Sequence, residues 1–349
     1  MPRVDLLSFT LEEAAEELRG LSLPKYRAGQ IFKWLHKGVD FPAMANLPAD
    51  LRANLAERYV AQPAVIMENK LSGRDDTLKF LFGLQDGQCV EGVLMRYRHG
   101  RTLCVSTQAG CRMGCVFCAS AIGGRVRNLT PGEMLGQVVS ANRYLGDTGH
   151  VSRVVLMGSG EPLDNYANVI KFLRLFTGPS GSMISMRRIS LSTCGLVPEM
   201  LKLAQEGLPV TLCVSLHAPN DTVRVKLIPA ASRYPIEDVL QACRNYTQVT
   251  GRRVILEYAL IDGINTSEGD ARELAERLRG MRCHVNLIPL NPIPESGLNP
   301  SSEADSEHFE QVLKAGHVSV TRRRELGDDI GGACGQLRRS CLSRQEAIK

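Results

Sequence analysis

Residues 103–118 read Leu-Cys-Val-Ser-Thr-Gln-Ala-Gly-Cys-Arg-Met-Gly-Cys-Val-Phe-Cys, and this stretch decides how the rest of the chain is interpreted. It begins as a short apolar strand and continues into a loop that its glycines mark as exposed. The loop carries Cys111, Cys115 and Cys118 in a C-x3-C-x2-C spacing. The stretch therefore predicts a strand that delivers three thiols to one loop.

From Leu103 onward, an alternation of strand and helix repeats six times. The first helix has a clear start signal, since Thr130 caps it, Pro131 takes its first position and Glu133 bonds back. Strands that alternate with helices of this length imply parallel strands and right-handed crossovers. Six units make an incomplete barrel, whereas eight would close one. The predicted fold is α/β, a partial (βα)6 barrel of the TIM type. The strands are expected to start near Leu103, Val154, Ile189, Val210, Val254 and Val285, and the helices to span about 131–145, 165–176, 197–206, 236–249, 267–279 and 303–315.

Polar and glycine-rich motifs follow the predicted strands at their carboxyl ends. In parallel α/β folds, ligands bind at this edge of the sheet. A purely structural sequence has no reason to place polar residues there, so the pattern predicts a ligand site at the barrel mouth. The motifs are Gly158-Ser159-Gly160-Glu161-Pro162, Ser192-Thr193, Ser215-Leu216-His217 and Asn291-Pro292.

The composition is that of an ordinary globular protein of 349 residues, with 44% hydrophobic and 23% charged residues. No run reaches the roughly 18 apolar residues of a membrane span. Residues 11–18 form an acidic amphipathic stretch, where a signal peptide would be apolar. We therefore expect a cytoplasmic protein without a membrane partner. The net charge of +5 is compatible with a polyanionic partner without demanding one. Eleven cysteines in a reducing compartment favour metal ligation or catalysis.

The chain is predicted to divide into four parts. Residues 1–60 have the apolar spacing of short helices and form an accessory domain. Residues 61–100 form a β-rich extension, and residues 101–320 form the partial barrel. Residues 321–349 are a C-terminal segment that follows the last repeat.

Three clustered thiolates are suited to one [4Fe–4S] cluster. A short loop with this spacing wraps three cysteines around a cubane and leaves the fourth iron without a protein ligand. That iron is free to chelate the amino and carboxylate groups of S-adenosylmethionine (SAM), whose carbon–sulfur bond an electron then cleaves. Structural zinc usually takes four ligands from two separated pairs, and no matching second pair lies nearby. A chance run of three buried cysteines is the remaining alternative.

The cysteine triad, with Phe117 before its last cysteine, resembles the signature of radical SAM enzymes, and residues 158–162 look like the GGEP-type motif of that family. More narrowly, the chain is similar to the RNA adenine methyltransferases of the RlmN and Cfr family over nearly its whole length. Ser159, Gly331-Gly332 and Cys194 depart from the family pattern without removing a group that has an assigned role. The segments that carry the resemblance are 26–35, 127–130, 215–220 and 327–337.

This resemblance implies methylation at C2 of adenine 2503 in 23S rRNA and of adenine 37 in some tRNAs, with two SAM molecules per turnover. It implies that Cys334 is methylated first and that a radical from a second SAM takes a hydrogen from this methyl group. The resulting carbon radical adds to the adenine. Glu91 is implied as the acceptor of the ring proton, and Cys104 as the thiol that releases the product by forming a disulfide with Cys334. An electron donor such as flavodoxin is implied, and DNA is not an expected partner.

Contacts to SAM and to RNA are implied around the same mouth. Arginines beside Cys334 and after the cluster loop are expected to anchor RNA phosphates, or else to form a solvated charged surface. These arginines are Arg322, Arg323, Arg324, Arg338, Arg339, Arg125 and Arg127. The implied SAM contacts are Gly160, Glu161, Ser192, Ser215, Leu216, His217 and Asn291.

Several alternatives stay open. From the residues alone, Cys104 is more simply a buried strand thiol, Glu91 a solvated strand residue and His217 a structural histidine. The chain could instead methylate C8 of the same adenine, be another radical SAM enzyme such as an activase, or be a non-catalytic iron–sulfur or zinc protein that binds RNA. C2 is favoured because residues 256–260 and 286–292 resemble RlmN more than Cfr.

Overall fold

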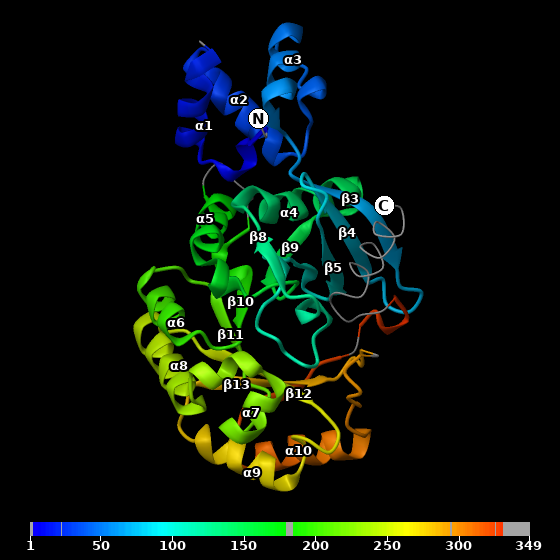
Figure 1. The fold of residues 1–349 in the computed structure, drawn as a ribbon, viewed down its shortest axis with the longest axis vertical. Helices are drawn as coiled ribbons and strands as arrows, with labels where there is room; N and C mark the ends of the chain where they lie inside the picture. The colour runs from blue at the N-terminus through cyan, green and yellow to red at the C-terminus, as the bar shows by residue number, and fades with distance from the viewer. Residues whose placement is uncertain (1–2, 22, 179–183, 294, 325, 331–349) are drawn as a thin grey trace.

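A ten-stranded mixed sheet is the framework of the computed structural model, which describes residues 3–21, 23–178, 184–293, 295–324 and 326–330 (Figure 1). Seven neighbouring strands of this sheet run parallel and form the partial barrel. Their apolar residues are buried almost without interruption, as expected for strands that are covered on both faces. The parallel strands, in spatial order, are β6 (Gly100–Cys104), β9 (Val151–Leu156), β10 (Ile189–Thr193), β11 (Thr211–Ser215), β12 (Val254–Leu260), β13 (Cys283–Pro289) and β14 (Val320–Arg322).

The six predicted strands are confirmed, but two details of the prediction were wrong. β14 adds a seventh parallel strand that the sequence did not reveal, because three residues are too few to show a period. The first strand was expected to start near Leu103, with Cys104 at its beginning. β6 instead starts at Gly100, directly after a hairpin from the preceding strand, so Cys104 is its last residue. This places the Cys104 thiol near the edge where the barrel opens.

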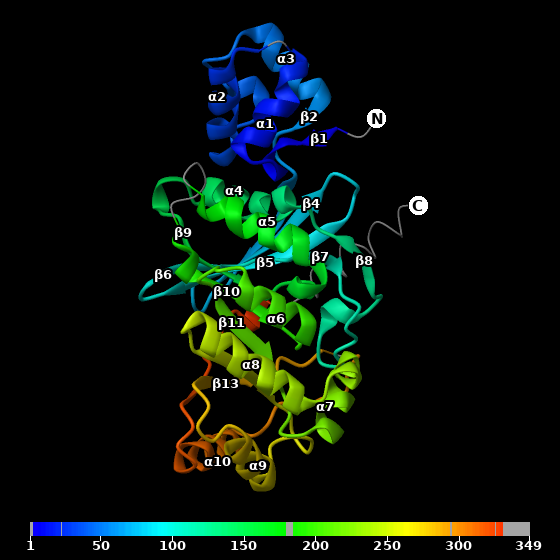
Figure 2. The ribbon, with the colours of Figure 1, turned by 90° about the vertical axis from the view of Figure 1, so that its left-hand side faces the viewer.

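Helices pack on the outer face of the parallel strands. Figure 2 shows α5, α6 and α8 lying across the face of the sheet that contains β10 and β11. Tyr246 illustrates the packing, since its buried hydroxyl donates a 3.0 Å hydrogen bond to the carbonyl oxygen of Val210. The six predicted helices are confirmed, and a seventh, short helix, α7 (Asp221–Leu227), was not expected. The predicted helices are α4 (Pro131–Leu145), α5 (Tyr166–Thr177), α6 (Val197–Gln205), α8 (Ile236–Thr250), α9 (Glu268–Arg277) and α10 (Glu303–Ala315).

Three antiparallel strands extend the sheet beyond β6, in the region where a β-rich extension was expected. They are hydrogen-bonded to one another and, through the last of them, to β6. In this register Val93 lies directly opposite both Lys79 and Cys104. The extension therefore continues one wall of the barrel. Its strands are β3 (Ala64–Leu71), β4 (Leu78–Leu84) and β5 (Cys89–Tyr97).

The N-terminal helices form a lobe at one end of the long axis, and α9 and α10 lie at the opposite end (Figure 1). In the lobe, Leu35, Phe41 and Leu55 are almost fully buried, and they belong to a hydrophobic cluster that continues into the barrel. Among the helices that the structure describes, none combines the length and apolar character that crossing a membrane requires. The helices of the lobe are α1 (Leu11–Glu17), α2 (Lys25–His36) and α3 (Ala49–Arg58).

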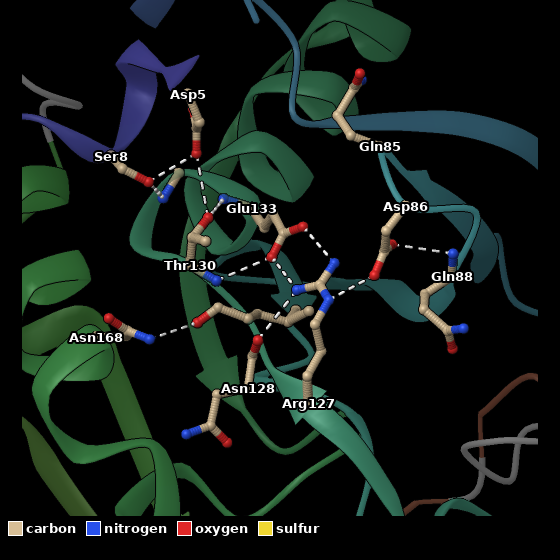
Figure 3. Close-up of polar contacts among 12 residues, drawn as sticks. Asp5, Ser8, Gln85, Asp86, Gln88, Arg127, Asn128, Thr130, Glu133 and Asn168 are labelled. Atoms are coloured by element: carbon tan, nitrogen blue, oxygen red, sulfur yellow. Dashed lines mark hydrogen bonds and ion pairs between the residues drawn. The ribbon is translucent and has the colours of Figure 1, made fainter. Parts of the chain in front are cut away.

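The lobe is joined to the barrel at the first turn of α4 (Figure 3). The predicted capping box is present, since Thr130 Oγ1 accepts a hydrogen bond from Glu133 N and Glu133 accepts one from Thr130 N. Thr130 Oγ1 also donates to Asp5, and Gly132 N donates to Ser8 Oγ at 2.8 Å. A side chain at Gly132 would collide with the Asp5 carboxylate. The glycine therefore permits the N-terminal segment to approach the helix closely.

Arg127 forms ion pairs with two carboxylates beside this junction (Figure 3). Its guanidinium donates to both oxygens of Glu133 at 2.8 Å and to Asp86 at 2.6 Å. These hydrogen bonds raise the pKa of Arg127 above its ordinary value. The expectation that Arg127 anchors an RNA phosphate stays a prediction. In the structure the residue ties the segment after the cluster loop to α4.

Replacing Arg127 with Gln removes these charge-assisted hydrogen bonds. We expect Arg127→Gln to lower the free energy of unfolding by about 1–3 kcal/mol, because Glu133 and Asp86 lose a cation at a partly buried site. Denaturant unfolding monitored by circular dichroism measures the difference. Arg187→Gln is the matched control, since Arg187 is exposed and the substitution removes the same charge. Equal stabilities of the two variants would contradict the role assigned to Arg127.

Candidate active site

A cavity of about 300 Å³ opens at the carboxyl ends of strands β9 to β13. The loop after β6 contributes the three clustered cysteines to its wall, and the loops after the other strands contribute polar groups. The position agrees with the edge at which parallel α/β folds bind ligands. The predicted site residues that line the cavity are Cys111, Cys115, Cys118, Gly160, Glu161, Ser192, Ser215, His217 and Asn291.

The three cysteines suit a cluster better than a single metal ion. Within the described residues, no three His, Cys, Asp or Glu side chains converge as the ligands of one ion would. A four-iron cubane binds each thiolate through a different iron atom, so its ligands need to surround a volume rather than a point. Burial raises the pKa of Cys111 to about 12, and the neighbouring Cys118 adds to this effect. Binding of iron by these thiols therefore has to release their protons.

The Gly158–Pro162 loop is held against the cluster loop by short contacts. Gly160 has a φ of 110°, and a side chain there would collide with Gln108. The next residue, Glu161, is buried, and burial raises the pKa of its carboxyl group. Its two oxygens accept backbone hydrogen bonds from Leu163 N at 2.9 Å and from Cys194 N at 2.8 Å. The loop therefore presents a fixed carboxylate to the cavity.

His217 lies at the cavity wall as a neutral imidazole. It has a φ of 57° and a ring 4.8 Å from that of Phe117, the residue before Cys118. Burial lowers the pKa of His217 to about 3. Its Nδ1 accepts a 2.9 Å hydrogen bond from Ala259 N, which assigns the ring proton to Nε2. His217 is therefore satisfied on one side, as a structural histidine would be, and keeps one donor for a ligand.

Two charged residues of the cavity wall, Glu257 and Arg323, were not predicted as SAM contacts. Glu257 accepts a hydrogen bond from Ser192 Oγ at 3.3 Å, and burial raises the pKa of its carboxyl group. Arg323 follows β14 and donates to Met95 Sδ of β5 at 3.8 Å, so its side chain spans the side that the partial barrel leaves open. Glu257 interrupts an apolar strand and was detectable on that ground. The interior position of Arg323 has no local signal.

Glu91 and Cys104 lie on the adjoining wall of the barrel, and the described lining of the cavity does not include them. Cys104 is buried at the end of β6. The alternative in which Glu91 is a solvated strand residue is wrong, because its side chain is 3% exposed and lies 3.0 Å from the Lys79 ammonium. Ser106 Oγ links this wall to the Gly158–Pro162 loop. It donates a hydrogen bond to the Glu91 carbonyl oxygen at 2.6 Å and accepts one from Ser159 N at 2.9 Å.

Leu216 does not line the cavity that the described residues form. Its side chain is fully buried, and its backbone N–H donates a 3.0 Å hydrogen bond to the Glu257 carbonyl oxygen. The expected contact of Leu216 with SAM stays a prediction. The hydrogen bond of Leu216 fixes the strand end that carries Ser215 and His217.

Cys334 lies outside the described residues, as do Arg338 and Arg339. The chain leading toward Cys334 is anchored on the turn between β3 and β4. Gly327 N donates to Asp75 at 2.8 Å, and Asp329 accepts hydrogen bonds from Ser72 Oγ at 2.8 Å and Gly73 N at 2.9 Å. The extension thus supports the start of the segment that holds this cysteine.

The other arginines near the site differ in their partners and in their exposure. Arg125 and Arg112 both pair with Asp164. Burial opposes ionisation of this aspartate, but the hydrogen bonds and charges of the arginines outweigh it and lower the pKa of its carboxyl group. Arg322 pairs with Glu303 at 2.7 Å, whereas Arg324 is exposed. The RNA-anchoring role expected for Arg125 stays a prediction, and in the structure this arginine ties the segment after the cluster loop to Asp164.

Two family descriptions match the chain, one at its N-terminal part and one over the barrel. Residues 4–61 match the Ribosomal RNA large subunit methyltransferase N-terminal domain. Residues 105–278 match the Radical SAM superfamily.

Curated relatives and a solved structure match over nearly the full length. A protein of Pelotomaculum thermopropionicum named "Probable dual-specificity RNA methyltransferase RlmN" is 50% identical over 349 residues, covering 99% of this chain and 94% of that protein. A protein of the same name from Lachnoclostridium phytofermentans is 48% identical over 340 residues, covering 97% and 95%. The crystal structure of a radical SAM methyltransferase from Sphaerobacter thermophilus superposes with a TM-score of 0.92 and 46% identity, covering 96% of this chain and 99% of that chain.

The neutral state of His217 has a measurable consequence for stability. Its pKa is about 3 in the folded protein and near 6.5 when unfolded, so the unfolded chain binds the extra proton between these values. The contribution of neutral His217 to the free energy of unfolding is complete above pH 6.5 and is lost as the pH falls toward 3. At pH 5 the loss is about 2 kcal/mol.

His217→Asn removes this titration while keeping an acceptor near Ala259 N and tolerating the positive φ. We expect the wild-type protein to lose about 2 kcal/mol more than the variant between pH 7 and pH 5 in denaturant unfolding. Parallel stability curves for the two proteins would show that His217 is not buried as a neutral ring.

Proposed function

This chain belongs to the RlmN family of radical SAM methyltransferases, and from that premise we propose that it methylates C2 of adenine 2503 in 23S rRNA and of adenine 37 in some tRNAs. The observation that carries the proposal is that the barrel places the cavity with the three clustered cysteines next to a second thiol and a carboxylate. The cysteine-lined cavity adjoins a wall on which Cys104 and Glu91 are both buried. A radical SAM enzyme that only activates another protein has no use for this second thiol and carboxylate.

Cys111, Cys115 and Cys118 are proposed to hold a [4Fe–4S] cluster, with an electron donor such as flavodoxin supplying the electron. Gly160, Glu161 and His217 offer a backbone, a carboxylate and an Nε2 donor that suit the polar ends of SAM. Ser192, Ser215 and Asn291 line the remaining polar part of the cavity. When bound, the cluster and two SAM molecules supply one methyl group and one carbon radical per turnover.

Three side chains of the chain itself are proposed to carry the methyl group to the adenine. The Cys334 thiolate takes the methyl group and, once a hydrogen has been removed from it, bonds through that carbon to the ring. Glu91 takes the proton from the attacked ring carbon. The unpaired electron of the adduct returns to the redox partner that supplied the reducing electron. The Cys104 thiolate then attacks the Cys334 sulfur, so that a disulfide forms as the sulfur–carbon bond breaks, and the released carbon keeps that electron pair and takes up a proton to become the methyl group.

The RNA partners follow from this chemistry and from the names of the relatives. The relatives described above are named as RNA methyltransferases, and the N-terminal lobe matches a domain description that names ribosomal RNA. A base that reacts at a ring carbon has to leave its stack to reach a buried site. We therefore propose RNA rather than DNA as the substrate, and the cytoplasm as its location. The C8 product remains the alternative that the experiment below distinguishes.

We further propose that the four parts of the chain divide this work. Residues 1–60 would contact RNA as an accessory domain, and residues 61–100 would carry Glu91 and support the segment leading to Cys334. Residues 101–320 would hold the cluster and SAM. Residues 321–349 would bring Cys334 to the barrel mouth.

The position of the methyl group is tested in RNA from cells with and without this gene. We expect 2-methyladenosine in both rRNA and tRNA digests when the gene is present, and its loss when the gene is deleted. Mass spectrometry with both nucleoside standards makes the measurement. Detection of 8-methyladenosine would replace C2 with C8, and detection of neither nucleoside would refute methylation of these RNAs.

Variants that lack one of the two proposed catalytic thiols are expected to stop at different stages of the reaction. Cys334→Ala should give no methylated RNA and no covalent complex, because the methyl acceptor is missing. Cys104→Ala should accumulate a covalent protein–RNA complex, because no thiol releases it. Denaturing gels with labelled RNA separate these outcomes, and Cys243→Ala, a buried thiol on α8, serves as the control that keeps turnover. Full turnover by Cys104→Ala would disprove its assignment.

A further inference from the structure

Lys79 and Glu91 form an ion pair inside the protein. The distance from Lys79 Nζ to Glu91 Oε2 is 3.0 Å, and the two side chains are only 1% and 3% exposed. Lys79 lies on β4 and Glu91 on β5, in antiparallel strands whose register pairs Lys79 with Val93 and Leu81 with Glu91. The two charged residues are therefore diagonal neighbours on one face of the sheet.

Such a pair is a poor means of holding two strands together. The free energy of removing two charged side chains from water is often larger than the free energy gained from their attraction. Apolar residues of similar volume at the same positions often stabilise a protein equally well or better. The flanking residue on the opposite face of β4, Phe80, is fully buried and apolar. Packing alone therefore gives no reason for a cation and an anion at these positions. A role in chemistry accounts for them better.

The pair lies beside the thiol that is proposed to release the product. Val93 is opposite Lys79 on one side and opposite Cys104 on the other, so these three residues form one row across β4, β5 and β6. Glu91 is two residues from Val93 along β5 and therefore projects from the same face. Through Ser106, the Glu91 backbone is also tied to the Gly158–Pro162 loop. The ion pair thus belongs to the wall that adjoins the cavity.

We propose that Lys79 is the positioning residue of the proton acceptor Glu91, an inference that rests on the proposed methyltransferase function. Lys79 holds the Glu91 carboxylate through the 3.0 Å ion pair and orients it toward the ring carbon that bonds to Cys334. In the step concerned, the ring C–H bond breaks, its electron pair stays with the ring, and the proton forms an O–H bond on Glu91. Lys79 keeps its own proton throughout.

An ammonium fixed 3.0 Å from Glu91 Oε2 restricts the rotamers of the carboxylate. It also balances the charge of a carboxylate that is buried away from water. Neither effect concerns the first methyl transfer, to Cys334. Lys79 should therefore influence only the stage after the covalent complex has formed.

Lys79→Gln tests the proposal in the full-length enzyme carrying its cluster. The amide keeps a hydrogen bond to Glu91 and removes the charge, and Lys79→Arg restores the charge. We expect Lys79→Gln to form methylated RNA about 10- to 100-fold more slowly and to accumulate the covalent protein–RNA complex. Methylation of Cys334, measured by mass spectrometry of the protein, should stay at the wild-type level. Lys79→Arg should recover most of the rate.

Rescue by the conservative variant separates positioning from a structural role. Lys79→Arg should release product from the covalent complex at close to the wild-type rate, whereas Lys79→Gln should not, and the Arg arm remains informative if the Gln variant is unstable. Adding Lys79→Gln to Glu91→Gln should cause no further loss, because both substitutions remove the same proton acceptor.

The contrary results are distinct from one another. If Lys79→Gln also abolishes methylation of Cys334, or multiplies the defect of Glu91→Gln, Lys79 supports the fold and the proposal is wrong. A wild-type rate of product formation in Lys79→Gln, or a rate in Lys79→Arg no higher than that in Lys79→Gln, also overturns it. Full turnover by Glu91→Gln would show that Glu91 is not the proton acceptor and would overturn the inference for that reason. Wild-type enzyme that yields no methyladenine at all would instead refute the proposed function, and this inference with it.

Discussion

Seven parallel strands run in the same direction through the barrel, so each of them ends at the same edge of the sheet. Right-handed crossovers leave little choice in this arrangement, because each helix has to return the chain across the outer face. The loops after the strands are then close in space although they are far apart in sequence. Cys111 and Asn291 line one cavity for this reason, although about half of the chain separates them. Every polar group of the candidate site depends on this shared direction.

A barrel interior that carries polar groups has to satisfy them internally. Glu161 binds two backbone N–H groups, His217 accepts one, and Asp164 pairs with two arginines. Each of these contacts also fixes a loop beside the cavity. The hydrogen bonds that make burial tolerable therefore give the site its shape as well. The Lys79–Glu91 pair extends the same principle to the antiparallel wall.

The β-rich extension takes part in the site from the side. Its strands continue the barrel wall beyond β6, and its β3–β4 turn holds residues 327 and 329 through three hydrogen bonds. Arg323 reaches Met95 across the open side of the barrel. The extension thus contacts the start of the segment after β14 at Arg323 and again at residues 327 and 329. This arrangement explains how a partial barrel can support a C-terminal segment without closing its sheet.

The sequence by itself determined the features that depend on neighbouring residues. The helix that begins at Pro131 was predictable because its cap lies within four residues, and the cluster loop because three cysteines share eight residues. The strand–helix alternation followed from periodicity, and the ligand edge followed from the alternation. The candidate SAM and catalytic residues were predicted from family resemblance. That resemblance did not show that the Leu216 side chain is buried away from the cavity.

Only the tertiary structure decided which charged groups meet. Arg125 and Arg127 appear as free cations in the sequence, yet each finds a carboxylate on an element distant along the chain. Lys79 pairs with Glu91 only because the register of β4 and β5 makes them diagonal neighbours. Glu257 and Arg323 face the cavity because of the strand order and the curvature of the sheet. Such pairs form when folding brings together segments that are far apart in the sequence. The residues around each charged group do not indicate how close these segments will lie in space.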